Sequence, residues 1–335
     1  VVRAAVSQKG LLLEHASDRL KNDLGIVLPA VNQNPNAVIY ASSTLKNASQ
    51  LMSVVLSKNG SLLEHASDQL KNDPDIFSIA MHSNVDAFIH GSKTLKNDRK
   101  IVLAVLRKKG ALFKYASNAL KNDAEIVLTA LTQSITEYIE SSIISILSEM
   151  SDELKNDADF MLTVVSNLSH HRYLNLNIFL YTSDTLKTNF KFVGDVLKIR
   201  GSNLEFLPAF YKEQKTLVFD AVKNYGSAFL YASPNLKNDR DIILAAVSQR
   251  GDLLKHLPIN FRNDRELVVA ALKEDPSEYK HIPDDLKSDR EVILTMLGKV
   301  WRGVNIKHLY RSTPAILKKD PEIILAAVIA DPSLM

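Results

Sequence analysis

One position along this chain holds histidine or an aromatic residue. The position recurs every 25 residues in two series, which are separated by one longer interval. The first series is His15, Tyr40, His65, His90 and Tyr115, and the second is Tyr181, Phe206, Tyr231, His256 and His281. A row of imidazoles could bind metal or stack on bases. Packed neighbouring helices stand about 8–10 Å apart, however, which is too far for easy shared ligation of one zinc ion. Because tyrosine and phenylalanine substitute freely, we interpret the row as half-buried rings packed between repeats.

A second position holds lysine or arginine in all twelve of its copies. Regularly spaced cations could follow a phosphate backbone. In most copies an aspartate two residues later offsets the charge, and lysine stems commonly cover apolar surface. We therefore favour a structural role and keep phosphate binding as the alternative. The copies are Lys21, Lys46, Lys71, Lys96, Lys121, Lys155, Lys187, Lys212, Lys237, Arg262, Lys287 and Lys318.

Positive charge gathers in one stretch, where Asp98 and Asp123 are the main opposing acids. Such a cluster could dock an acidic partner or anionic lipid head groups, and a solvated face is the reading we favour. Arg107, Lys108 and Lys109 within it are candidate partner contacts. The cluster consists of Lys96, Arg99, Lys100, Arg107, Lys108, Lys109, Lys114 and Lys121.

Two interruptions of the repeat add further candidates. Adjacent histidines in the second of the three long intervals suggest metal, but no carboxylate or third histidine follows at ligand spacing, so a loop is favoured. The third long interval contains the lone tryptophan, and binding surfaces are enriched in Trp, Tyr and Arg. Burial of that tryptophan is an equal alternative. The candidate partner contacts in these segments are His170, His171, Arg172, Tyr173, Trp301, Arg302 and Tyr310.

Signatures of an enzyme are absent from the sequence. No glycines are spaced for a Gly-x-Gly-x-x-Gly or Walker loop, and Gly-x-Ser-x-Gly and His-Glu-x-x-His do not occur. The chain has no cysteine, which excludes disulfides, thiolate metal sites and cysteine nucleophiles. A net charge of +3 from 41 basic and 38 acidic residues disfavours nucleic acid as a partner. No apolar run is long enough for a membrane span. We expect a soluble protein without catalytic residues, metal or cofactor.

These positions belong to a 25-residue repeat whose key residue is the leucine of Leu-Lys-Asn-Asp. Three of its intervals are longer than 25 residues, by nine, seven and six residues. Caps, periodicity and local propensity agree on an all-α solenoid of about twelve two-helix repeats, because one such hairpin cannot bury its own apolar face. The key position is filled by Leu20, Leu45, Leu70, Leu95, Leu120, Leu154, Leu186, Tyr211, Leu236, Phe261, Leu286 and Leu317.

Each part of the repeat predicts a local structure. The Asn/Ser-Asp pair predicts a helix N-cap, and Ser288 with Glu291 fits a capping box, as does Asn263 with Glu266. The helix that follows is apolar at i, i+1, i+4 and i+5. Glycines at its end predict left-handed C-caps. A second, shorter helix follows, and then a short third turn that carries the key leucine.

The insertions predict a division of the array. We expect regular repeats over 1–133, irregular repeats over 134–190, and regular repeats over 191–335 with an insertion near 298–313. A single long helix with its apolar face from Ile135 to Met150 should replace the first lost glycine turn. Neither end has a polar capping repeat, so we expect a fragment of a longer protein.

The pattern from the Leu-Lys-Asn-Asp phrase through the glycine to the Ala-Ser pair resembles the domain of unknown function 4116 family. Residues 236–251 and 95–110 match it best, and 134–150, 167–180 and 298–313 depart from it. In that family the repeats occur in tandem in bacteria, including secreted effectors of intracellular pathogens, and in some single-celled eukaryotes. The resemblance implies a helical array with an interaction role, cytoplasmic or secreted into a host cell. It carries no catalytic motif.

A non-enzymatic scaffold that binds a protein partner is the leading hypothesis for function. Solenoids present a long concave surface, and this one varies most where the first helix of each repeat ends. A binder of nucleic acid or an anionic surface is the alternative, and steep salt dependence would distinguish it. The targeting region of an enzyme whose catalytic domain lies outside the chain is the third. The insertions and the surroundings of Trp301 are the expected places of partner contact.

Overall fold

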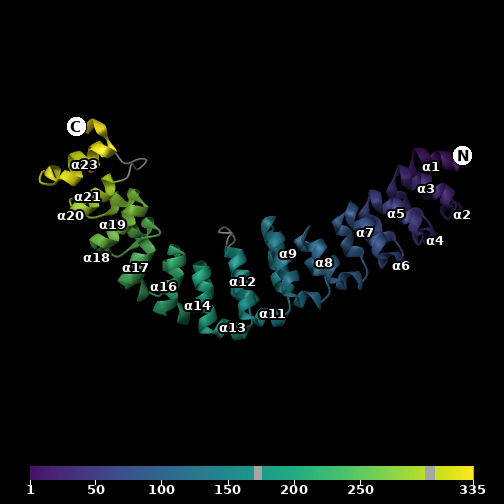
Figure 1. The fold of residues 1–335 in the computed structure, drawn as a ribbon, viewed down its shortest axis with the longest axis horizontal. Helices are drawn as coiled ribbons and strands as arrows, with labels where there is room; N and C mark the ends of the chain where they lie inside the picture. The colour runs from purple at the N-terminus through teal and green to yellow at the C-terminus, as the bar shows by residue number, and fades with distance from the viewer. Residues whose placement is uncertain (170–175, 299–305, 335) are drawn as a thin grey trace. The chain divides into compact units, whose positions relative to one another are not determined.

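The computed structural model describes residues 1–169, 176–298 and 306–334, and these ranges contain helices, turns and connections but no β-strand. Two compact units divide the chain, unit 1 at Val1–Val164 and unit 2 at Val165–Met335. In unit 1, α3, α5 and α7 pack side by side, while the short helices α2, α4 and α6 follow one edge (Figure 1). The all-α repeat architecture predicted from the sequence is confirmed. In the described ranges, no helix has both the length and the apolar character to cross a membrane.

Each regular repeat contains three elements. In the repeat that begins at Ser49 they are α5 (Ser49–Lys58), η3 (Gly60–His65) and α6 (Asp68–Lys71). The long α-helix and the short third turn agree with the prediction, and all twelve key residues lie in such a turn. The second helix is a six-residue 3₁₀ helix, a form used for short pieces of this kind.

Unit 1 repeats this order with local variations. Its elements are α1 (Val2–Gln8), η1 (Gly10–His15), α2 (Asp18–Lys21), α3 (Leu24–Gln33), η2 (Pro35–Tyr40), α4 (Ser43–Lys46), α5, η3, α6, α7 (Pro74–Ser83), η4 (Val85–His90), η5 (Leu95–Asn97), α8 (Arg99–Leu106), η6 (Gly110–Tyr115), η7 (Leu120–Asn122), α9 (Ala124–Thr136), α10 (Glu140–Glu149) and α11 (Asp152–Asn156). The boundary with unit 2 falls within α12 (Ala158–Ser169).

Unit 2 continues the same order. Its elements after α12 are η8 (Ile178–Tyr181), α13 (Asp184–Thr188), α14 (Phe190–Ile199), η9 (Gly201–Phe206), α15 (Ala209–Lys212), α16 (Lys215–Asn224), η10 (Gly226–Tyr231), η11 (Leu236–Asn238), α17 (Arg240–Val247), η12 (Gly251–His256), α18 (Ile259–Arg262), α19 (Arg265–Glu274), η13 (Pro276–His281), α20 (Asp284–Lys287), α21 (Arg290–Leu297), α22 (Ile306–Ser312), η14 (Leu317–Lys319), α23 (Pro321–Ala330) and η15 (Pro332–Leu334).

Most of the long helices have an aspartate N-cap. The carboxylate of Asp289 accepts hydrogen bonds from the backbone N–H groups of Glu291 and Val292, at 2.9 and 3.2 Å. The capping boxes predicted with Ser288 and Asn263 are therefore wrong, because each helix starts one residue later. A single aspartate already satisfies two of the free N–H groups there.

The long helices pack against each other in chain order and form the core. In α17, Ile242, Ile243, Ala246 and Val247 are all completely buried. This helix contacts both α16 and α19. The predicted burial of the i, i+1, i+4, i+5 face on two sides is confirmed.

The glycines after the long helices have a different role from the predicted one. None of those in this slot has a left-handed φ, so the predicted C-caps are wrong. Gly60 opens η3, and its N–H donates to Ser83 Oγ in the next repeat at 3.2 Å. A Cβ at Gly60 would lie 2.1 Å from Ala80 O. Glycine and the small alanine together therefore allow two repeats to approach at the backbone.

Polar side chains join each repeat to the next. Ser92 Oγ donates to Asn72 Oδ1 at 2.6 Å, and Ser92 N donates to Lys71 O at 3.1 Å. Equivalent Ser–Asn pairs join 42 to 22, 67 to 47, 117 to 97 and 151 to 122. The Asn of Leu-Lys-Asn-Asp is thus an acceptor for the following repeat.

The first insertion forms two helices where one was predicted. α9 has 13 residues and ends at Thr136, and α10 has 10 residues in place of the usual six-residue 3₁₀ helix. Between them Tyr138 adopts a left-handed φ of 57°, so the continuous face from Ile135 to Met150 is broken. Ser151 N still donates to Lys121 O at 3.1 Å, which keeps the usual junction between repeats.

A carboxylate occupies one apolar core position of unit 2. Glu278 lies in the slot that Leu253 fills one repeat earlier, and the two residues are 3% and 2% exposed. Its Oε2 has no hydrogen-bond partner, and burial raises the pKa of the Glu278 carboxyl. We expect Glu278→Leu to raise the free energy of unfolding by about 2 kcal/mol, because an unsatisfied buried polar group is removed. Urea unfolding followed by circular dichroism measures it, and an unchanged or lower value would contradict the assignment.

The raised pKa also gives a pH dependence. Glu278 is protonated in both folded and unfolded chains below its ordinary value near 4.5, so no penalty applies there. Above that value the unfolded chain ionises first, so its stability relative to the folded chain increases until the pH passes the raised pKa of the folded state. Relative to Glu278→Gln, the wild type should therefore lose stability as the pH rises from about 4.5 through that raised pKa. A constant difference between the two proteins would show that the carboxyl is solvated.

Candidate binding surface on the long helices

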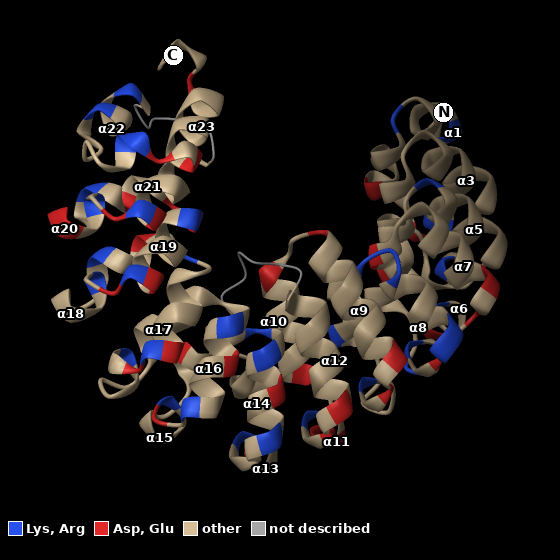
Figure 2. Cartoon of the chain, turned by 60° about the vertical axis from the view of Figure 1, so that its left-hand side comes forward, with Lys and Arg blue, Asp and Glu red and all other residues tan. Residues whose placement is uncertain are grey.

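The long helices of unit 2 leave one face uncovered, and its side chains form three rows that cross the helices. An N-terminal row contains Asp241, Glu266 and Glu291, and a C-terminal row contains Lys223, Ser248 and Lys273. The apolar row between them contains Phe219, Leu244 and Val269, of which Val269 is buried, at 4% exposed. Members of a row are 25 residues apart because they occupy one slot of successive repeats. Figure 2 shows acidic and basic segments next to each other where α17 begins.

Two grooves open on this face. The first, about 650 Å³, lies between α16 and α17, and Phe219, Leu244 and Ala245 give it an apolar floor. The second, about 600 Å³, lies between α17 and α19 and is more polar. Leu244 and Ser248 line both grooves, so α17 is the ridge that separates them. Volumes of this size are in the range of ligand pockets.

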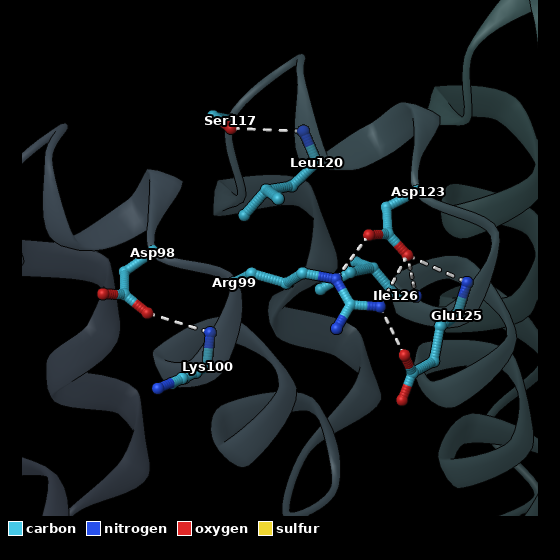
Figure 3. A network of polar contacts seen from close by, with 8 residues as sticks. All are labelled: Asp98, Arg99, Lys100, Ser117, Leu120, Asp123, Glu125 and Ile126. Atoms are coloured by element: carbon cyan, nitrogen blue, oxygen red, sulfur yellow. Dashed lines mark hydrogen bonds and ion pairs between the residues drawn. The ribbon is translucent and has the colours of Figure 1, made fainter.

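Each acid of the N-terminal row contacts a cation of the preceding repeat. Arg240 Nε lies 2.7 Å from Asp264 Oδ2, and its Nη2 contacts Glu266. Figure 3 shows the equivalent network in unit 1, where Arg99 bridges Asp123 and Glu125. The same arrangement pairs Lys215 with Asp239 and Asp241, Arg265 with Asp289 and Glu291, and Arg290 with Asp320 and Glu322.

These contacts shift the titration of their members. Hydrogen bonds from Arg99 lower the pKa of Asp123, and hydrogen bonds to Asp239 and Asp241 raise the pKa of Lys215. Asp123 and Lys215 are therefore both charged near neutral pH. Because each cation is shared by two carboxylates, the N-terminal row keeps net negative charge.

The C-terminal row retains its charge. Over the ranges that the structure describes, neither Lys223 nor Lys273 has a carboxylate within ion-pair distance. The Lys223 ammonium lies 5.6 Å from the centre of the Phe219 ring, so charge and apolar surface adjoin at one end of the first groove. This surface suits a ligand that combines an apolar side chain with an acidic one.

Three cations of the basic cluster of unit 1, Arg99, Lys109 and Lys121, are held in ion pairs. Lys109 Nζ lies 2.8 Å from Asp86 Oδ1, and Lys121 Nζ lies 2.8 Å from Glu149 Oε2. Arg107 lines a third groove, of about 480 Å³, together with side chains of α9. Lys108 is exposed. Of the three candidates from this cluster, Arg107 alone lines that groove, and Lys109 is held by its ion pair.

Most of the other sequence candidates lie outside the described residues. Tyr310 is described, and it is half-buried in α22. Those outside are His170, His171, Arg172, Tyr173, Trp301 and Arg302.

The regularly spaced lysines hold the chain within their own repeats. Lys96 Nζ donates to Ile89 O at 2.6 Å, seven residues earlier, at the end of the 3₁₀ helix. Cations at a helix C-terminus stabilise it, and burial lowers the pKa of both Lys46 and Lys96. Lys46, Lys155, Lys212 and Lys318 make the same bond. The structural interpretation of this row therefore has direct support.

The histidine and tyrosine row lies at the ends of the 3₁₀ helices. His65, His90 and Tyr115 are half-buried, while His15 and His256 are exposed. Within the described ranges, no group of three His, Cys, Asp or Glu residues is placed to hold a metal ion. The row thus agrees with packing between repeats.

The apolar row was missed by the sequence reasoning. In Ile242-Ile243-Leu244, the first two residues belong to the buried i, i+1, i+4, i+5 set and Leu244 does not. An apolar residue outside that set, repeated at Phe219 and Val269, was the available signal.

Comparison with family models decides the classification. The model described as a domain of unknown function, DUF4116, matches residues 1–46, 50–96, 98–144, 215–262 and 264–301, which together make up more than half of the chain. The chain belongs to the DUF4116 family. Each matched DUF4116 segment covers about two of the structural repeats described above. No curated protein and no solved structure matches the chain.

Proposed function

We propose that this DUF4116 array is a non-enzymatic scaffold that binds a segment of a protein partner on the uncovered face of its long helices. The observation that carries the proposal is the pair of adjoining grooves on α16, α17 and α19, with an apolar floor in the first. Clefts that combine apolar lining with a few polar groups are the usual form of a binding site.

The roles of the other polar side chains support this function. The aspartates cap helices, the serines and asparagines join repeats, and the lysines bind carbonyl groups. Few repeat residues are left for chemistry. The lysines would also make a poor phosphate track, because five of their ammonium groups are already bound to the backbone. That the array acts inside a host cell is a finer proposal, which rests on the family resemblance alone.

A blocking variant tests the proposal. Peptides from a random displayed library would be selected on the full chain, and their dissociation constants measured for the wild type, Ser248→Tyr and Ser57→Tyr. Ser248 is exposed on the ridge between both grooves, and Ser57 occupies the same repeat slot on α5 of unit 1.

We expect selected peptides to bind Ser248→Tyr at least about tenfold more weakly, since the tyrosine ring would fill the groove entrances, and to bind Ser57→Tyr as they bind the wild type. Both variants should unfold at the wild-type temperature because both sites are exposed. Peptides that bind all three proteins equally would place the binding surface elsewhere. Binding that survives only at low salt, and is shared by single-stranded DNA, would favour the nucleic-acid alternative.

A further inference from the structure

The arrangement of the two grooves constrains how a ligand can use both. They are parallel to the helices and share Leu244 and Ser248 as their common wall. A ligand lying along the first groove touches Phe219 but leaves Ala270 on α19 uncontacted. A ligand that reaches both must cross α17, roughly perpendicular to its axis.

The repeat distance then selects a chain conformation. Neighbouring packed helices stand about 8–10 Å apart, so equivalent points of the two grooves are separated by about that distance. A polyproline II chain rises about 3.1 Å per residue with three residues per turn, which is about 9 Å per turn. Every third side chain of such a peptide therefore points the same way and meets the next groove. An α-helix laid across the same face is about 10–12 Å wide and would rest on the ridges.

Charge selects the side chains between the anchors. The N-terminal row keeps negative charge because each cation there is shared by two carboxylates, as Arg240 is by Asp264 and Glu266. The C-terminal row presents Lys223 and Lys273 on either side of the uncharged Ser248. A three-residue period gives the peptide three edges, of which one enters the grooves and one faces these lysines. Acidic residues on that edge complement them, and basic residues would be repelled.

We infer, building on the proposed function, that unit 2 binds an extended peptide with an apolar side chain at every third position and acidic side chains on the edge that faces Lys223 and Lys273. The first apolar anchor lies on Phe219 and Leu244, and the next lies beyond the ridge beside Ala270, which lines the second groove. Affinity then increases with the number of correctly spaced anchors.

Defined peptides test the spacing. The probes, called the phased peptides, are fluorescein-labelled peptides of three Leu-Glu-Pro units and of three Leu-Pro-Glu units. The two differ in whether the glutamate directly follows or directly precedes the leucine. Proline favours the extended form in the residue before it. The control has the same composition with leucines four residues apart. Fluorescence anisotropy with the full chain gives each dissociation constant. We expect one of the phased peptides to bind at least about tenfold more tightly than the control.

Matched variants assign the contacts. Ser248→Tyr should weaken binding of the phased peptide at least about tenfold, whereas Ser57→Tyr should leave its affinity unchanged. Lys223→Gln combined with Lys273→Gln should weaken binding and reduce its dependence on salt, while Lys280→Gln, an exposed lysine of η13, should do neither. Melting temperatures confirm that each variant is folded.

Three results would overturn the inference: equal binding of phased and control peptides, no measurable binding of either phased peptide, or unchanged affinity in Ser248→Tyr. The proposed function fails separately. If library peptides bind in a manner that depends on Ser248 but lack the three-residue spacing, the scaffold function stands. The inferred extended peptide with an apolar residue at every third position is then wrong. If no library peptide depends on Ser248, the binding surface itself is wrong.

Discussion

Gly201→Ala should lower the free energy of unfolding by about 3 kcal/mol. The added Cβ would lie 2.1 Å from Ala221 O and 2.9 Å from the carbonyl carbon. Both are backbone atoms of the neighbouring long helix, so the clash is relieved only when η9 and α16 move apart. That movement also strains the hydrogen bond from Gly201 N to Asn224 Oδ1, which is 2.7 Å long. Urea unfolding followed by circular dichroism measures the loss.

Gly226→Ala is the matched control. It occupies the same slot one repeat later, but its Cβ would lie 3.1 Å from the nearest atom, Ala246 O. Neither glycine has a left-handed φ, so backbone strain does not separate them, and alanine lowers the entropy of the unfolded chain in both. We expect the control to cost less than about 1 kcal/mol. Equal losses at the two positions would show that close approach is not the reason for glycine in this slot.

Ala246→Asp should cost about 4 kcal/mol or more, because it places an unpaired charge in the core. Ala246 is 0% exposed, and α17, which carries it, contacts long helices on both sides. Chemical unfolding monitored by circular dichroism measures the change. A wild-type melting temperature would contradict the proposed stacking.

Ala245→Asp is the control for this substitution. Ala245 is the preceding residue of the same helix and lines the first groove, so its carboxylate would remain hydrated. The same change in helix propensity and charge then costs less than about 1 kcal/mol. This pair separates burial from every other effect of introducing aspartate into α17.

The fold was predictable wherever the residues that determine a feature lie within a single repeat. Asp239 caps the helix that follows it, and the apolar period of Ile242 to Val247 marks the buried face, so caps, helices and stacking could be read from a single 25-residue unit. The constant residue after the key leucine was also correctly suspected to be structural, although its partner, a carbonyl seven residues earlier, could not be identified.

Features that depend on the next repeat could not be predicted. Gly60 looked like a helix C-cap because its actual partner, Ala80 O, is twenty residues away in sequence. The capping boxes failed because Asp264 and Asp289 compete for the same N–H groups at shorter reach. The binding surface was missed for a related reason: Phe219 and Leu244 form a groove only after two helices pack, and within one repeat each is simply an apolar residue next to a core position.

The junction between repeats has a consequence for how such a chain can change in length. In this junction one unit offers an asparagine acceptor and a glycine, and the following unit offers a serine donor and a small alanine. The two ends of a unit are therefore complementary to each other. A duplicated unit of 25 residues that carries all four residues can make the same bonds on both sides, so the array can lengthen by whole units wherever the neighbours carry them too. Other repeats lack part of the set, as where Pro258 replaces the serine. A fractional insertion, as in the segment that contains α10, has to be accommodated within one unit while its junctions stay intact.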